Sequence, residues 1–186
     1  MLTKQTTIQF CGFGGQGIVL SSVVFGTTAV TRAGLQAVQT QSYGSEARGG
    51  ECQAELILSP ERIKSPISNE VEVLVALSRP ALTQYLPRLK PGGTLIIDPD
   101  LIKNVPETEA KVIAIPATQT ANSLGVKMVM NMYVLGFLQQ ATGLFSADDL
   151  FAVISENTPA RFEEVNLKAA HAGMDYAKTQ SITLEL

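Results

Sequence analysis

The sequence predicts an α/β fold, with a doubly wound, mostly parallel, Rossmann-like sheet and a helical C-terminal third. Three observations support this. Short apolar runs typical of strands alternate with helical stretches, the glycine-rich segment "GFGGQG" (12–17) separates the first strand from the first helix, and the last third shows only helical patterns. The length of 186 residues favours a single domain over 1–186.

Six segments are expected to be strands, because each is apolar or alternates over a strand-like length. They span residues 7–12, 35–40, 52–59, 71–77, 94–98 and 111–117. The apolar run 17–33 is too long for an ordinary strand and is predicted to be a buried helix. A short helix is expected over 80–89, with Pro80 near its first turn.

The C-terminal third is predicted to hold three helices. Residues 122–142 are expected to form one helix, apolar nearly all round and therefore buried on all sides, that ends at Gly143. The next helix has Ser146 as its N-cap. The last begins at Thr158–Pro159 and carries an apolar stripe. The stripe consists of Phe162, Val165, Ala169, Ala172 and Tyr176.

Composition limits the classes of function. Charged residues make up only 17% of the chain, so we expect a partner to cover part of its surface, with a homodimer possible for the isolated chain. A net charge of −3 argues against nucleic acid or an anionic membrane as a partner. Two cysteines cannot supply a disulfide framework or an iron–sulfur cluster. The N-terminus does not resemble a signal peptide. Both observations favour a location in the cytoplasm.

The glycine loop satisfies the pattern G-x-G-x-x-G through Gly12, Gly14 and Gly17, with Gly15 as a fourth glycine. Glycine lets a phosphate approach the backbone, where helix N–H groups point at it. A dinucleotide site also needs an acidic residue about 20 positions further on, and the segment "AVQTQSYG" has none. Two interpretations stay open: an anionic ligand, or glycines that only allow close packing.

The segment "YGSEARGG" (43–50) lies between two predicted strands. Arg48, among small residues, offers an exposed guanidinium suited to a carboxylate or phosphate. Gly49 and Gly50 allow a sharp turn and a close partner. The alternative is a surface ion pair between Arg48 and Glu46, which would contribute little.

The motifs "CGFGGQGIVLSS", "QSYGSEARGGECQAELILS", "DPD" and "IPATQTANSLG…NMYVLG" occur in this order. With them the chain resembles the gamma subunit of the 2-oxoacid:ferredoxin oxidoreductases over a core of residues 7–178. The resemblance implies a cytoplasmic complex that oxidatively decarboxylates a 2-oxoacid to an acyl-CoA and reduces ferredoxin. It favours 2-oxoglutarate, followed by pyruvate and branched-chain acids.

The resemblance also implies a complex that uses thiamine diphosphate, Mg²⁺, iron–sulfur clusters and CoA. This chain has no "GDG…N" pattern and too few cysteines, so no cofactor is assigned to it alone and no catalytic residue is predicted in it. The cofactors would lie in alpha, beta and ferredoxin-like delta subunits. We hypothesise that 43–50 contacts the thiamine-binding subunits near the CoA entrance, where Arg48 pairs with an anionic group and Glu46 holds it.

The expected ligand or subunit contacts form one set: Gly12, Gly14, Gly15, Gln16, Gly17, Tyr43, Gly44, Glu46, Arg48, Gly49, Gly50 and Asn131. For Asn131, a buried amide bonded to backbone is favoured over contact with the glycine loop. The methionines around it are expected in the core or an interface.

Other candidates are assigned structural roles. His171 has no partner for catalysis nearby in sequence, and Cys11 is expected to be a buried, inert thiol. Asp98 and Asp100 suggest an Asx turn rather than a magnesium site. Two further hypotheses remain: a self-sufficient nucleotide-binding oxidoreductase that uses the glycine loop, and a scaffold without any ligand.

Overall fold

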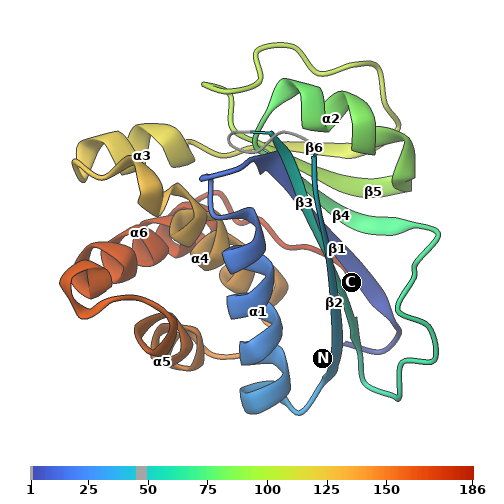
Figure 1. Ribbon diagram of the computed structural model, residues 1–186, viewed down its shortest axis with the longest axis horizontal. Coiled ribbons are helices and arrows are strands. Elements are labelled where there is room, and N and C mark those ends of the chain that lie inside the picture. Colours follow the sequence, from blue (N-terminus) through green and yellow to red (C-terminus); the bar gives the residue numbers. More distant parts are fainter. Residues whose placement is uncertain (1, 45–49) are drawn as a thin grey trace.

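The computed structural model describes residues 2–44 and 50–186 and contains a six-stranded sheet in the order β2-β3-β1-β4-β5-β6 (Figure 1). Three pairings, β1–β4, β4–β5 and β5–β6, are parallel, while β1–β3 and β2–β3 are antiparallel. This confirms the α/β class and the mostly parallel sheet. The strands are β1 (Thr6–Phe13), β2 (Gln36–Tyr43), β3 (Glu51–Ser59), β4 (Val71–Ala76), β5 (Leu89–Ile97) and β6 (Lys111–Ala114).

The antiparallel half departs from the strand-helix alternation expected of a doubly wound sheet. A parallel pair needs a crossover connection of a dozen or more residues. Only residues 44–50 separate β2 from β3, so the chain reverses and these strands pair as neighbours. β1 then pairs with β3 on one side and with β4 on the other.

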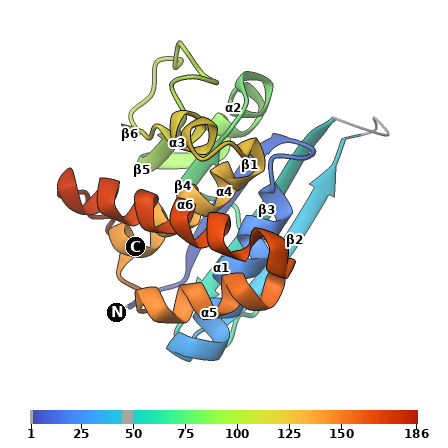
Figure 2. The ribbon, with the colours of Figure 1, turned by 90° about the vertical axis from the view of Figure 1, so that its left-hand side faces the viewer.

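Helices cover both faces of the sheet (Figure 1). α2, with the 3₁₀ turn η1 after it, lies on one face, and the other helices lie on the opposite face. Figure 2 shows α6 crossing in front of α4, with α5 beside it. The helices are α1 (Ile18–Ala33), α2 (Arg79–Tyr85), η1 (Leu86–Arg88), α3 (Ala117–Ser123), η2 (Lys127–Val129), α4 (Met130–Thr142), α5 (Ala147–Asn157) and α6 (Ala160–Thr179).

The single helix predicted over 122–142 is wrong at its start. α3 ends at Ser123, and Gly125 takes a left-handed conformation (φ 74°) that a helix cannot contain. The chain turns there, and α4 begins only at Met130. α4 itself is buried on nearly every side, as its apolar composition predicts, and Gly143 caps it.

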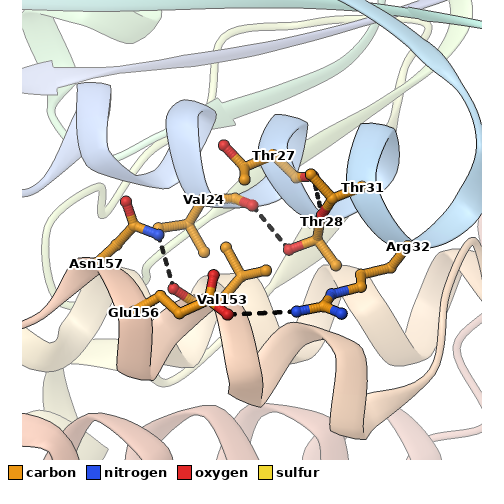
Figure 3. A network of polar contacts seen from close by, with 8 residues as sticks. All are labelled: Val24, Thr27, Thr28, Thr31, Arg32, Val153, Glu156 and Asn157. Atoms are coloured by element: carbon orange, nitrogen blue, oxygen red, sulfur yellow. Dashed lines mark hydrogen bonds and ion pairs between the residues drawn. The ribbon is translucent and has the colours of Figure 1, made fainter.

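Figure 3 shows polar contacts within and between α1 and α5. Arg32 of α1 forms an ion pair with Glu156 of α5 at 3.3 Å, between exposed side chains. The Thr28 hydroxyl donates to the carbonyl of Val24 in its own helix at 2.8 Å. The ion pair links α5 to α1.

The two predicted C-terminal helices are confirmed. Ser146 caps α5 in a reciprocal capping box with Asp149, and Pro159 precedes α6. Among the described helices, none combines the length and apolar character that a membrane crossing requires.

Candidate functional site

The candidate site lies where the parallel strands end. α1 follows β1 on one face of the sheet, whereas α2 follows β4 on the other (Figure 1). β1 and β4 are neighbours, so the crevice between their carboxyl ends is a topological switch point, the usual ligand position in open α/β sheets. The glycine loop, residues 14–17 between β1 and α1, lies at this crevice.

Gln16 turns its side chain into the crevice. Its Oε1 accepts a hydrogen bond from the backbone N–H of Phe13 at 2.6 Å. Its Nε2 donates to the carbonyl of Leu77, directly after β4, at 2.9 Å. The amide thus links the ends of β1 and β4 and is committed to bonds within the chain.

The glycines of segment 12–17 differ in what surrounds them. A Cβ on Gly12 would overlap the Gln16 side chain, and one on Gly17 would overlap the amide of Asn131. Gly17 is also left-handed (φ 73°) as the N-cap of α1. Close packing therefore explains Gly12 and Gly17. Gly15 is left-handed too (φ 94°), but it faces open space.

Asn131 lies in the first turn of α4 and is only 3% exposed. Its side chain packs against Gly17, so the helix that was predicted to be buried reaches the glycine loop. Asn131 also lines a mostly apolar cavity of about 140 Å³ between α1, α4 and the start of α6. Gly15 and Met128 lie on the rim that this cavity shares with a larger one.

The larger cavity, of about 340 Å³, lies between the glycine loop, α3 and η2. Among the described residues that line it, Lys127 is the sole basic side chain. Polar groups also come from Gln16, Thr118 and Asn122. The first turn of α1 has no acidic residue and no side-chain cap, so its N–H groups keep their partial positive charge. An anionic group fits these surroundings.

Lys127 was not among the residues singled out from the sequence. It reaches the cavity because the chain turns at Gly125 and places η2 beside the glycine loop. The turn glycine two residues before this basic residue is the sequence signal that points to it.

The segment 43–50 ends beside the glycine loop. The N–H of Gly14 donates to the carbonyl of Gly50 at 2.9 Å, and the N–H of Gly44 donates to the carbonyl of Glu51 at 2.6 Å. Tyr43, at the end of β2, is 63% exposed. The structure therefore brings the end of segment 43–50 next to the glycine loop, although the two motifs lie far apart in the sequence. Glu46, Arg48 and Gly49 lie outside the described residues.

Asp98 has a structural role, as the Asx-turn prediction requires. Its Oδ1 accepts from the N–H of Asp100 at 2.9 Å, and its Oδ2 accepts from the N–H of Thr118 at 2.6 Å. The buried carboxylate thus ties the end of β5 to the first turn of α3. In residues 2–44 and 50–186, no group of three or more His, Cys, Asp or Glu could hold a metal ion.

The two cysteines and the histidine are not placed for catalysis. Cys11 and Cys52 are buried free thiols. Burial, reinforced by the nearby Glu51 carboxylate, raises the pKa of the Cys11 thiol far above its ordinary value, so the thiol stays protonated and inert. His171 packs on Phe151, with ring centroids 4.2 Å apart.

Comparison with known proteins gives a consistent result. Residues 7–176 match the family model described as pyruvate ferredoxin/flavodoxin oxidoreductase. The 2-oxoglutarate synthase subunit KorC of Methanothermobacter thermautotrophicus is 41% identical over 182 residues, which cover 94% of this chain and 96% of that protein.

Two solved structures are similar to the whole fold. One is the keto/oxoacid ferredoxin oxidoreductase gamma subunit from Geobacter sulfurreducens, with a TM-score of 0.82, 34% identity, and coverage of 94% of this chain and 99% of that one. The other is 2-oxoglutarate:ferredoxin oxidoreductase from Magnetococcus marinus with 2-oxoglutarate, coenzyme A and succinyl-CoA bound. It has a TM-score of 0.80 and 25% identity, and the match covers 99% of this chain but 32% of that one.

Proposed function

This chain belongs to the pyruvate ferredoxin/flavodoxin oxidoreductase family, and we propose that it acts as the gamma subunit of a 2-oxoglutarate:ferredoxin oxidoreductase. The reaction would convert 2-oxoglutarate, CoA and oxidised ferredoxin to succinyl-CoA, CO₂ and reduced ferredoxin. One observation carries the choice of acid. The 2-oxoglutarate synthase subunit from Methanothermobacter thermautotrophicus aligns with this chain over nearly the full length of both, at 41% identity.

The remaining subunits would supply the cofactors. Among the described residues, no group of three or more His, Cys, Asp or Glu could hold a metal ion, so these residues do not fit magnesium or iron–sulfur ligation. Thiamine diphosphate, Mg²⁺ and the clusters would then belong to alpha, beta and ferredoxin-like delta subunits. We place this complex in the cytoplasm, where the two buried thiols stay reduced.

The chain's own contribution would concern CoA. Lys127 lines the larger cavity, and the uncapped first turn of α1 begins two residues after Gln16, which also lines it. Both attract the phosphates of a nucleotide. Gly50, the last residue of 43–50, is bonded to the same loop through the N–H of Gly14. We therefore place the glycine-loop end of the molecule against the thiamine-binding subunits, with CoA between them and Arg48 paired with an anionic group.

Reconstitution of the complex tests this function. The chain is co-expressed with the partner subunits, and reduction of ferredoxin is followed with 2-oxoglutarate, pyruvate or 3-methyl-2-oxobutanoate. We expect CoA-dependent activity, with the highest kcat/KM for 2-oxoglutarate and none for the isolated chain. A higher kcat/KM for pyruvate would contradict the choice of acid. CoA-independent turnover by the isolated chain would instead favour a self-sufficient enzyme.

A further inference from the structure

We propose that Gln16 is a positioning residue whose side-chain amide replaces a peptide group between β1 and β4 and fixes the position of the glycine loop. The pairing of the two strands shows what the amide replaces. Their last paired residues are Cys11 and Ala76, and the next parallel bond is present, from the N–H of Leu77 to the carbonyl of Cys11 at 2.8 Å.

A regular parallel ladder would continue with a bond from the N–H of Phe13 to the carbonyl of Leu77. The Gln16 amide stands between these two groups instead, accepting from Phe13 and donating to Leu77. The strands are thereby held apart by one amide group, and both backbone groups stay satisfied. Only a side chain with both a donor and an acceptor can do this, which glutamine provides and glutamate does not.

The residues around the amide are shaped to admit it. Gly12 has no Cβ where the Gln16 side chain passes, so the first glycine of the motif makes room for this residue rather than for a phosphate. The next backbone group after Phe13 is the N–H of Gly14, which bonds the carbonyl of Gly50. Gln16 thus sets where the loop stands relative to β4, and the loop in turn holds Gly50.

Loss of the amide leaves the N–H of Phe13 and the carbonyl of Leu77 without a partner, because the two backbone groups are one amide group apart. The glycine loop is then held less firmly to the end of β4. The effect on turnover rests on the proposed function, because it assumes that the glycine-loop end of the molecule meets CoA. The local effect does not depend on that assumption.

Two variants of the full chain test the inference by amide hydrogen exchange. Gln16→Met removes both bonds and should speed exchange of the Phe13 amide by about tenfold, the factor expected for one lost hydrogen bond. Gln16→Glu keeps the acceptor and should leave Phe13 protected. The control is Gln139→Met, which removes a buried bond from Nε2 to the carbonyl of Phe145 (2.7 Å) within the α4–α5 region.

The same variants are then compared in the reconstituted complex. Gln16→Met should raise the KM for CoA by about tenfold with little change in kcat, whereas Gln139→Met should change neither beyond its effect on stability. Unchanged exchange at Phe13 in Gln16→Met would overturn the inference whatever the complex does. Faster exchange with normal CoA kinetics would support the local role of Gln16 and contradict the proposed placement of CoA.

Discussion

Lys127 shows how much the position of a single side chain depends on one backbone turn. It is exposed, on the 3₁₀ turn η2, and it lines the cavity beside the glycine loop. A lysine ammonium binds phosphate as a point charge, while an arginine binds it through two parallel bonds. If CoA phosphates lie in the cavity, Lys127 should affect binding of CoA more than the chemical step.

We predict that Lys127→Ala and Arg48→Ala each raise the KM for CoA about tenfold in the complex, since a charge-assisted bond contributes about 1.5 kcal/mol or more. Lys127→Arg should restore most of the affinity. Lys168→Ala is the control, because Lys168 is on the exposed face of α6, paired with Glu164 at 2.6 Å. Normal assembly, CoA KM and turnover in Arg48→Ala would remove the role hypothesised for that residue.

At the scale of elements, α4 and α6 are held unusually close by two glycines. A Cβ on Gly136 would overlap the backbone of Ala170, and one on Gly173 would overlap the backbone carbonyl of Tyr133. Backbone atoms cannot move aside as the end of a side chain can, so the helix contact requires glycine at both positions. This contact also fixes the start of α4, where Asn131 meets the glycine loop.

Gly136→Ala and Gly173→Ala should therefore each lower the free energy of unfolding by about 3 kcal/mol or more. Gly26→Ala in α1 is the matched control: its added Cβ would meet only the side-chain end of Leu56, 2.9 Å away. The gain in helix propensity on replacing glycine by alanine, about 1 kcal/mol, offsets the cost of that contact. The stability of Gly26→Ala should therefore stay near that of the parent chain. Urea unfolding measures the free energy of unfolding of all three variants. An equal loss of stability in all three would disprove the explanation by backbone contact.

At the scale of the whole molecule, the surface is poor in charge and carries several large apolar side chains. Val23 and Val30 on α1 are 37% and 45% exposed, and Ile67 and Met128 are each 72% exposed. Only 17% of residues are charged. So low a share of charged residues leaves little polar side chain to cover an isolated chain, which favours a partner over part of its surface.

The isolated chain should therefore self-associate, and sedimentation velocity over a dilution series should show the monomer fraction rise on dilution. Val30→Lys places a charge on the exposed side of α1 and should shift the equilibrium towards monomer. A single monomeric species at every concentration would contradict the prediction. Binding of the partner subunits should compete with self-association, because both would cover the same apolar side chains.

Much of the fold was open to prediction from the sequence, because the signals are local. Strand and helix periodicities, the Ser146 cap and the Gly143 stop act over a few residues, and each corresponds to an element of the structure. The low number of cysteine and histidine residues can likewise be read directly from the composition. The family motifs are contiguous in sequence, and the similarity to known proteins agrees with them.

Only the tertiary structure decided the pairing of β1 with β3 and the inward position of Gln16. Both depend on contacts between segments far apart in the chain. A strand pairs with whichever edge buries its apolar face, and an amide turns inward only if two strand ends leave a gap of its size. Local sequence cannot encode such a gap, because the packing of the entire domain creates it.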